Sequence, residues 1–453
     1  MQPLPKEFEE QMKRLLGEAG FFAYLNALNQ PYTRALRVNL LLRPDGTLPC
    51  SIEGLGAPVP WAKGAYFVEG DARPGLSPLH EGGLFYMQEP SALTAVTALD
   101  PQPGERVLDL CAAPGGKSTQ IAALMAGRGL LCCNEPIPSR AQILSRNIER
   151  MGVRNAVVLS AMPDALAPRF PAFFDRILVD APCSGEGMFR RQPEARDEWD
   201  ADAPRRCADR QMEILAQAAK MLRPGGTMVY STCTFNDTEN EGVLKRFLAL
   251  HPAFSLAPFA LPGLPEAKDG YLHLYPHEMR GEGHFVSRLK KADGADEAGA
   301  PVQAAPQRKA PARAAAKGKA PAPIALPDVF SDAFAPERLY TAGDALWMLP
   351  EGLSIEQLSG LRVLRTGLLL AHAEGKRSEP DHALAMALRP EEAARTASLT
   401  QTQALAYQAG ETLSLGDLPG GYTLLCCEGV SLGWGKQAGG LMKNHYPKGL
   451  RRR

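Results

Sequence analysis

One stretch of twelve residues, 107–118, constrains the fold of this chain more than any other. It reads Val-Leu-Asp-Leu-Cys-Ala-Ala-Pro-Gly-Gly-Lys-Ser, and the helical pattern Ser-Thr-Gln-Ile-Ala-Ala-Leu-Met begins at its last residue. The apolar start is typical of a buried strand, the glycines let the backbone approach a ligand, and the N–H groups of a first helical turn can face that ligand. The standard phosphate-binding motifs are absent. The stretch therefore indicates a nucleotide-type pocket, with an ordinary tight turn as the alternative.

The alternation of strand and helix continues along the chain. Apolar runs predict strands at 106–111, 130–134, 156–160, 176–180 and 227–232, with a further strand at 284–289. Helical spacing predicts helices at 119–126, 139–151, 203–222 and 239–250. This rhythm is typical of an α/β fold with a Rossmann-like, doubly wound sheet. In such sheets ligands bind beyond the carboxyl ends of the strands, so we expect the functional residues there.

The length of 453 residues predicts several domains rather than one core. We expect a small N-terminal α/β domain (1–78) with a helix to about residue 30 and a strand at 34–42, and then the Rossmann-like domain (79–290). Residues 291–325 are rich in Ala, Pro and Lys, which predicts a linker. Two small C-terminal domains (326–392 and 393–453) complete the predicted division.

Composition limits the classes of protein to which the chain can belong. Apolar content of 45% and charged content of 22% are typical of a globular protein. No apolar run approaches the roughly 18 residues of a membrane helix, so we expect a cytoplasmic protein without membrane contact. We also expect a monomer. The pairs Cys132-Cys133 and Cys426-Cys427 lie in apolar runs and predict buried thiols. No Cys-x-x-Cys motif occurs, so we expect no metal.

Reactive side chains follow three of the predicted strands. Glu135 ends the second strand, about 20 residues past the glycine turn, where a carboxylate can accept hydrogen bonds from ribose hydroxyls. Asp180 ends the fourth strand and is followed by Pro182 and Cys183. Cys233 ends the fifth strand. Either cysteine alone is typical of a buried structural thiol, but two thiols at the mouth of one pocket predict a reactive site.

These motifs resemble the Nop/Sun family of RNA cytosine-C5 methyltransferases over residues 1 to about 290. The resemblance is carried by 109–117 (Asp-Leu-Cys-Ala-Ala-Pro-Gly-Gly-Lys), 180–187 (Asp-Ala-Pro-Cys-Ser-Gly-Glu-Gly), 231–234 (Ser-Thr-Cys-Thr) with 239–241 (Glu-Asn-Glu), and 86–91. The tail, with 433–436 (Gly-Trp-Gly-Lys) and 444–448 (Asn-His-Tyr-Pro-Lys), resembles the PUA-like, barrel-shaped end of the bacterial RsmF branch, which modifies small-subunit (16S) ribosomal RNA.

The resemblance implies S-adenosylmethionine as the cofactor. Its binding residues would be Cys111, Ala112, Ala113, Pro114, Gly115, Gly116 and Lys117 in the turn, with Glu135 on the ribose and Asp180 near the methyl donor and the target base. The family often has an acidic or amide residue near the adenine. This chain instead has Ser160-Ala-Met162, with Asp164 two positions on. The adenine contact would then pass to a backbone amide or to Asp164.

Cytosine chemistry explains why the site would need a thiol. Carbon 5 is a poor nucleophile until a group adds at carbon 6, and a partly ionised thiol does this well. A carboxylic acid at the N3 edge, a role predicted for Asp180, would stabilise the adduct, and Lys117 is a candidate for lowering a thiol pKa or orienting the base. DNA cytosine methyltransferases use the Pro-Cys thiol, which would be Cys183. The RNA family uses the Thr-Cys thiol, so we predict Cys233 as nucleophile and Cys183 in product release.

The C-terminal tail is basic and carries aromatic residues, which is typical of surfaces that bind RNA. The candidate RNA contacts are Trp434, Lys436, Lys443, Tyr446 and Lys448, with a glycine-rich hairpin around a core Trp434 as the alternative. We therefore predict an rRNA cytosine-C5 methyltransferase that acts on the small ribosomal subunit. A tRNA methyltransferase and a catalytically silent RNA-binding assembly factor remain as alternatives. Two thiols beside the pocket count against a methyltransferase acting on protein or a small molecule.

Overall fold

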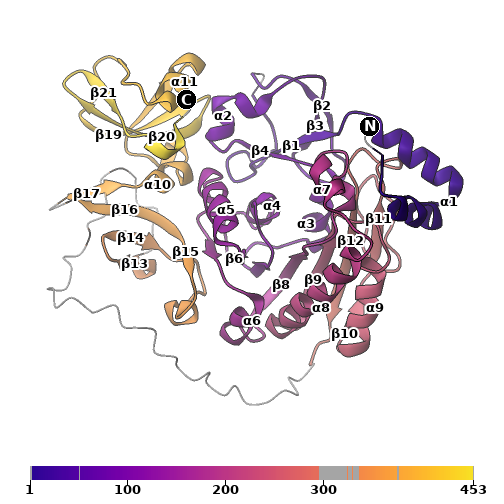
Figure 1. Cartoon of the computed structure of the whole chain (residues 1–453). Helices are drawn as coiled ribbons and strands as arrows, with labels where there is room; N and C mark the ends of the chain where they lie inside the picture. The colour runs from indigo at the N-terminus through magenta and orange to yellow at the C-terminus, as the bar shows by residue number, and fades with distance from the viewer. Residues whose placement is uncertain are drawn as a thin grey trace.

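The computed structural model describes residues 3–49, 51–294, 324, 329, 336–374 and 377–451. The predicted linker 291–325 lies outside the described residues except for 291–294 and 324. The described chain forms one large central sheet and three four-stranded sheets, which Figure 1 shows in the colours of the chain order. No helix in these ranges is long and apolar enough to cross a bilayer.

The central sheet has the strand order β10-β12-β9-β8-β5-β6-β7-β15, with β11 beside β12. The five strands predicted to be parallel are β5 (Arg106–Asp109), β6 (Leu130–Asn134), β7 (Ala156–Leu159), β8 (Phe174–Asp180) and β9 (Leu222–Thr232). The sixth predicted strand, β12 (His284–Lys291), runs antiparallel to β9 and also pairs with β10 (Phe254–Leu256) and β11 (Tyr271–Leu274). The doubly wound sheet is thus confirmed, with one antiparallel edge.

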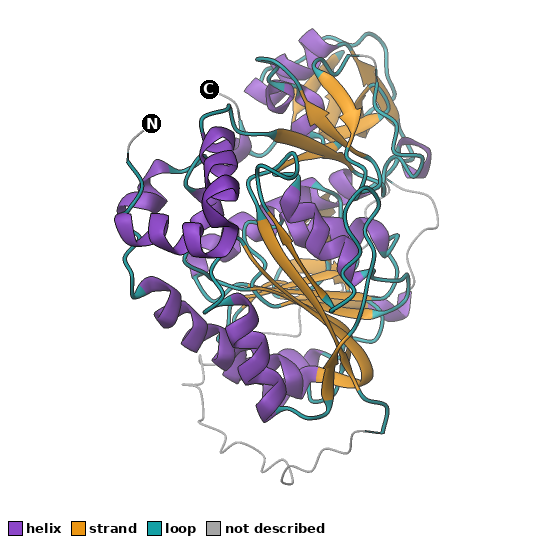
Figure 2. Cartoon of the chain, turned by 90° about the vertical axis from the view of Figure 1, so that its right-hand side faces the viewer, coloured by secondary structure: helices purple, strands orange, loops and turns teal. Residues whose placement is uncertain are grey.

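Two apolar cores lie against this sheet, because its parallel strands are apolar on both faces. One core includes residues of α3 (Thr94–Leu99), α4 (Gly116–Leu124) and α5 (Pro138–Arg150). The other includes residues of α6 (Pro163–Leu166), α8 (Ala203–Met221) and α9 (Asn240–Leu250). Figure 2 shows the twisted strands with helices packed beside them. Each fully buried Leu or Phe side chain contributes about 1.5–3 kcal/mol to the free energy of folding. These two cores therefore hold the strand ends in fixed positions.

The N-terminal segment begins with α1 (Lys6–Leu28), which is broken at Gly17, where φ is 68°. A sheet follows in the order β2-β3-β1-β4, built from β1 (Arg34–Val38), β2 (Leu55–Pro58), β3 (Ala65–Val68) and β4 (Phe85–Gln88). Short α2 (Pro78–Glu81) precedes β4. The fourth strand lies beyond residue 78, so this sheet crosses the predicted domain boundary. Helix α1 packs elsewhere, against Phe189, Trp199 and Phe235 of the central domain, near α7 (Pro193–Asp197).

The C-terminal part contains two open sheets. The first is β13 (Leu339–Ala342), β14 (Ala345–Met348), β16 (Leu368–Glu374) and β17 (Arg377–Pro380), followed by α10 (His382–Ala387). The second is β18 (Thr396–Leu399), β19 (Gly421–Cys427), β20 (Val430–Ala438) and β21 (Leu441–Asn444), with α11 (Gln401–Ala409). The predicted barrel is therefore wrong. The apolar faces are covered by neighbouring parts of the chain instead of by closure of a sheet on itself.

A strand pairing and a shared apolar core are among the contacts that attach the C-terminal part to the rest of the molecule, together with ion pairs such as Arg154–Glu392. Strand β15 (Val363–Arg365) pairs with β7 and extends the central sheet by one strand. The second C-terminal sheet shares one apolar core with the N-terminal sheet, in which Leu36 and Phe85 lie with Leu425 and Leu432. The adjacent cysteine pairs at 132–133 and 426–427 are buried in cores, as predicted.

Candidate active site

The glycine turn connects β5 to α4 at the middle of the sheet. Gly115 has φ of 113°, a backbone conformation that glycine adopts without strain. A Cβ on Gly116 would lie 3.2 Å from Tyr86 Cε1 and 3.3 Å from the Gln88 amide, so the N-terminal segment packs closely behind the turn. Asp109, at the end of β5, accepts a hydrogen bond from Ser118 Oγ at 2.7 Å, and burial raises its pKa to about 7. The turn is held from both sides.

Glu135 follows β6, beside the turn, as predicted. Its Oε1 accepts a hydrogen bond from the Ile137 N–H at 3.0 Å, and its Oε2 lies 3.3 Å from Arg140 Nη1. Ile137 and Met162 follow the neighbouring strands β6 and β7, and both are large apolar side chains that remain exposed. Exposed apolar side chains at adjacent strand ends can receive a flat, apolar ring. No motif in the sequence points to Ile137.

Asp180 is the polar centre of the site. Its Oδ2 accepts a hydrogen bond from Lys117 Nζ at 2.8 Å, and its Oδ1 accepts one from Ser231 Oγ at 2.9 Å. His284 Nε2 lies 3.6 Å from Oδ1. Burial opposes ionisation of Asp180, but the Lys117 ammonium and His284 outweigh burial and hold the pKa of this carboxyl well below its usual range. Asp180 is thus an ionised carboxylate, whereas we predicted a carboxylic acid.

His284 also belongs to the site, although no motif in the sequence predicts it. It begins β12, and pairing of Phe285 with Thr232 brings it beside the end of β9. Burial lowers its pKa, which favours the neutral imidazole. A histidine at the start of a strand is a weak signal, because only the antiparallel pairing of β12 places it near Asp180.

The two predicted thiols lie together. Strands β8 and β9 pair in register, with Asp180 opposite Ser231, and Cys183 Sγ lies 3.3 Å from Cys233 Sγ. The hydrogen bond to Cys233 and burial raise the pKa of Cys183 well above its usual value. Cys183 is therefore a protonated thiol that can donate to the sulfur of Cys233.

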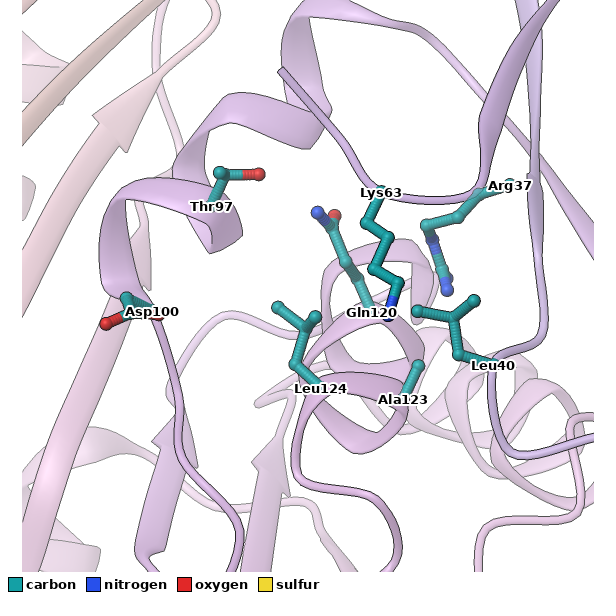
Figure 3. Close-up of a pocket in the computed structure, with 8 residues that line it drawn as sticks. All are labelled: Arg37, Leu40, Lys63, Thr97, Asp100, Gln120, Ala123 and Leu124. Atoms are coloured by element: carbon teal, nitrogen blue, oxygen red, sulfur yellow. The ribbon is translucent and has the colours of Figure 1, made fainter. Parts of the chain in front are cut away.

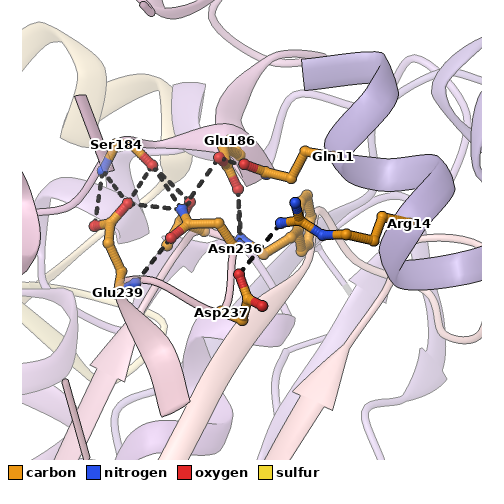
Figure 4. Close-up of polar contacts among 9 residues, drawn as sticks. Gln11, Arg14, Ser184, Glu186, Asn236, Asp237 and Glu239 are labelled. Carbon is orange, nitrogen blue, oxygen red and sulfur yellow. Dashed lines mark hydrogen bonds and ion pairs between the residues drawn. The ribbon is translucent and has the colours of Figure 1, made fainter. Parts of the chain in front are cut away.

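A network of buried polar groups joins the loops that carry these thiols (Figure 4). Glu239 accepts hydrogen bonds from the Ser184 N–H in the Cys183 loop, and from the amides of Gln211 and Asn236 at 2.7 and 2.8 Å. Glu186, also from the Cys183 loop, accepts from the N–H groups of Phe235 and Asn236 in the Cys233 loop. Both carboxylates are fully buried. The network fixes one loop against the other and is the physical reason that the sulfurs meet.

Helix α1 completes this network from the N-terminus. Gln11 Nε2 donates to Glu186 Oε1 at 2.9 Å, and Arg14 Nη2 lies 3.5 Å from Asp237 Oδ1 (Figure 4). Phe8 packs edge-on against Phe189 with ring centroids 4.9 Å apart. None of these contacts was predicted, because they join residues about 175 to 223 positions apart in the chain.

Comparison with known proteins decides the family. The chain matches the models described as N-terminal domain of 16S rRNA methyltransferase RsmF (4–90), 16S rRNA methyltransferase RsmB/F (96–290), RsmF rRNA methyltransferase first C-terminal domain (327–388) and methyltransferase RsmF PUA domain (394–452). It is 34% identical to the ribosomal RNA small subunit methyltransferase F of Erwinia tasmaniensis and to that of Escherichia coli O6:H1, over 98% of this chain and 96% of each relative. The chain belongs to the RsmB/F family of 16S rRNA methyltransferases.

Two solved structures are similar to part of this chain. A methyltransferase homolog protein from Pyrococcus horikoshii is 30% identical, with a TM-score of 0.54 over 63% of this chain and 95% of that chain. NSun6 from Pyrococcus horikoshii, with a TM-score of 0.55, covers 64% of this chain and 98% of its own length; at 23% identity it shows the shared fold alone.

The C-terminal candidates of this RsmB/F protein divide into two groups. Trp434 and Tyr446 are 2% and 4% exposed, and Trp434 Nε1 donates to the Asp381 carbonyl at 2.8 Å. The prediction that these two rings stack on RNA is wrong, because both are core residues. For Trp434 this agrees with the alternative prediction of a hairpin around a core tryptophan. Lys443 and Lys448 are exposed, while Lys436 is half-buried with its Nζ 4.6 Å from the Tyr422 ring centroid. No cluster of metal-ligating side chains occurs within the described ranges.

Proposed function

We propose that this protein transfers a methyl group from S-adenosylmethionine to carbon 5 of cytosine in small-subunit (16S) ribosomal RNA, through a covalent bond between Cys233 and carbon 6. The observation that carries the proposal is the pair of sulfurs 3.3 Å apart beside an ionised Asp180–Lys117 pair. A methyltransferase for a protein or a small molecule needs neither thiol. The relatives' names supply the substrate, and we extend that substrate to this chain.

The residues around the glycine turn fit S-adenosylmethionine. The buried Glu135 carboxylate has lone pairs to accept hydrogen bonds from ribose hydroxyls, and Ile137 and Met162 offer apolar surface for the adenine ring. The turn from Cys111 to Lys117 brings backbone N–H groups of the start of α4 to the methionine end. When bound, the cofactor supplies an electrophilic methyl group. We also propose that the protein is located in the cytoplasm and is a monomer.

Cys233 begins the reaction on the base. Its sulfur forms a bond to carbon 6 of a cytosine that has left its stack, and electron density moves onto carbon 5. Carbon 5 would then form its bond to the methyl group while the bond between that methyl and the cofactor sulfur breaks, which would leave a neutral thioether as the leaving group. The proton on carbon 5 passes to water, and the bond between sulfur and carbon 6 breaks. Cys183, held protonated, donates a hydrogen bond to the departing Cys233 thiolate and assists product release.

Asp180 and Lys117 act on the N3 edge of the base as a pair. The ionised Asp180 carboxylate accepts a hydrogen bond from the exocyclic amine of cytosine. The Lys117 ammonium, 2.8 Å from Oδ2, supplies the proton that a carboxylic acid would otherwise provide. Lys117 therefore belongs to the site through this pairing as well as through the cofactor turn.

Transfer of labelled methyl from S-adenosylmethionine tests the function. Small subunits, naked 16S RNA and bulk tRNA are compared as acceptors, with wild type, Cys233→Ala and Cys183→Ala. We expect label in small-subunit RNA that Cys233→Ala abolishes. Label mainly in tRNA would overturn the substrate and leave the chemistry standing. RNA binding without label in any acceptor would favour a silent assembly factor.

A further inference from the structure

Arg37 is a buried cation without an anionic partner among the described residues. It lies in β1 of the N-terminal sheet, its exposed fraction is 2%, and its hydrogen bonds go to backbone carbonyls, a hydroxyl and an amide oxygen. Burial lowers its pKa to about 9, so it stays protonated at neutral pH. Burying a charge without a counter-charge is costly. The hydrogen bonds that Arg37 makes must therefore matter to this protein.

Three of these hydrogen bonds go to Gly116 and Thr119 at the start of α4, and one goes to Gln88 of β4. Arg37 Nη2 donates to Thr119 Oγ1 at 2.8 Å and to the Gly116 carbonyl at 3.2 Å. Both acceptors belong to the first turn of α4, whose N–H groups begin the cofactor site. Thr119 Oγ1 itself donates to the Gly115 carbonyl at 2.8 Å. One guanidinium thus reaches the glycine turn directly and through Thr119.

Arg37 lines a cavity, so on the side that faces this cavity its guanidinium is not closely packed and is held by hydrogen bonds. A cavity of about 130 Å³ lies between the N-terminal segment and helices α3 and α4. Figure 3 shows Arg37 and Lys63 entering this cavity opposite Gln120 of α4. Lys63 is exposed, and no hydrogen bond from it to α4 occurs within the described residues. The two cations line the same cavity, but Arg37 is the one bonded to the turn.

We propose that Arg37 is a positioning residue by which the N-terminal domain holds the Gly115–Gly116 turn in the conformation that binds S-adenosylmethionine. The inference rests on the proposed function, since it assigns the cofactor site a support from another domain. The planar guanidinium bonds two acceptors at once, which a lysine ammonium on a flexible stem does less well. The planar shape of the Arg37 guanidinium, and not only its charge, is then required to hold the turn.

Calorimetric binding of S-adenosylmethionine to the full chain, without RNA, tests the proposal. Arg37→Met should raise the Kd about tenfold, the effect of losing one hydrogen bond to a charged group. Arg37→Lys, which keeps the charge, should also weaken binding, by several-fold. Thr119→Val removes the shortest bond and should weaken binding in the same direction. Lys63→Met, which loses a cation from the same cavity, should stay within about twofold of wild type.

Kinetics separate positioning from general destabilisation. We expect a higher KM for S-adenosylmethionine, with kcat at saturating cofactor and the KM for RNA within about twofold of wild type. A lower Tm with an unchanged Kd for the cofactor would overturn the proposal. If Arg37→Met does not fold, Arg37→Lys and Thr119→Val carry the same test. Wild type that fails to bind S-adenosylmethionine would overturn the proposed function, whereas binding by wild type and variants alike would overturn only the role of Arg37.

Discussion

At the scale of single residues, the chemistry of the site depends on Asp180 being ionised. Burial alone would raise the pKa of this carboxyl, and Lys117 reverses the direction. Because the pKa in the folded protein lies below that of a free aspartate, about 3.9, the ionised form persists to low pH and is lost only as the pH falls through the lowered value. Activity should therefore not be limited by Asp180 near neutrality.

Replacing Lys117 changes this balance. In Lys117→Met burial acts on Asp180 with less opposition, so its pKa rises and the acidic limb of the pH–rate profile moves to higher pH. We also expect kcat to fall by about 10² or more, as for loss of a general acid. The profile of kcat/KM, extended below the pKa of a free aspartate, about 3.9, measures the shift. An acidic limb in the same place as in wild type would show that Lys117 does not control Asp180.

The residues of the site could be predicted where they belong to short local motifs. Asp180 ends β8 with Cys183 three residues further on, and Cys233 and Glu135 directly follow β9 and β6, so the parallel strands place all four at the same edge of the sheet. His284 and Arg37 could not be predicted, because each reaches the site through a strand pairing or a domain contact between residues far apart in the chain.

At the scale of elements, the spacing of the two sulfurs depends on the loops after β8 and β9. Asn236 is the link between them, since its amide donates to Glu239 at 2.8 Å and to Glu186 at 3.1 Å. Burial raises the pKa of Glu239, while Ser184, Asn236 and Gln211 lower it through their hydrogen bonds. Loss of Asn236 would leave two buried carboxylates close together with fewer donors.

We therefore expect Asn236→Ala to lower the free energy of unfolding by about 2–4 kcal/mol and to lower kcat with it. Thermal denaturation and methyl transfer measure the two effects. Arg14→Ala is the matched control: it breaks the neighbouring contact to Asp237, but both side chains are more than half exposed, so the change should stay within about 0.5 kcal/mol. Equal effects of the two substitutions would contradict the role given to the network.

Strands could be predicted where they coincide with long apolar runs. They could not be predicted where only pairing with a distant strand defines them. All five parallel strands of the central sheet follow apolar runs and were found. Strand β15 has three residues and pairs with β7, about 200 positions earlier in the chain, so no local pattern predicts it. The barrel was implied by the resemblance of the tail. It does not form because other parts of the chain cover these sheets, and no local pattern shows that covering.

At the scale of the whole molecule, the N-terminal and second C-terminal sheets share one core. Leu432 is 1% exposed in that core, and Gln408 Nε2 donates to the Pro78 carbonyl at 3.0 Å. The two ends of the chain should therefore unfold together. Leu432→Ala should lower stability by about 2–5 kcal/mol and keep one thermal transition, measured by calorimetry. A separate early transition of the C-terminal part would contradict the shared core.

The exposed lysines of the C-terminal sheet should act in RNA binding rather than in chemistry. Lys443→Glu with Lys448→Glu should raise the KM for RNA, reduce the salt dependence of RNA binding by about two phosphate contacts, and leave kcat within about twofold. Lys220→Glu and Lys245→Glu, exposed on α8 and α9, give a control with the same change in charge. If this control weakens RNA binding as much, the C-terminal lysines have no specific role.

The most direct test of the central claim is to identify the cysteine that bonds to RNA. Cys183→Ala should lose the donor that helps Cys233 depart, so incubation with S-adenosylmethionine and small-subunit RNA should leave a stable protein–RNA adduct. After nuclease digestion, mass spectrometry should place a methylated cytidine on Cys233, and Cys233→Ala should give neither adduct nor product. An adduct on Cys183 in Cys233→Ala, or methylated RNA without Cys233, would contradict the account.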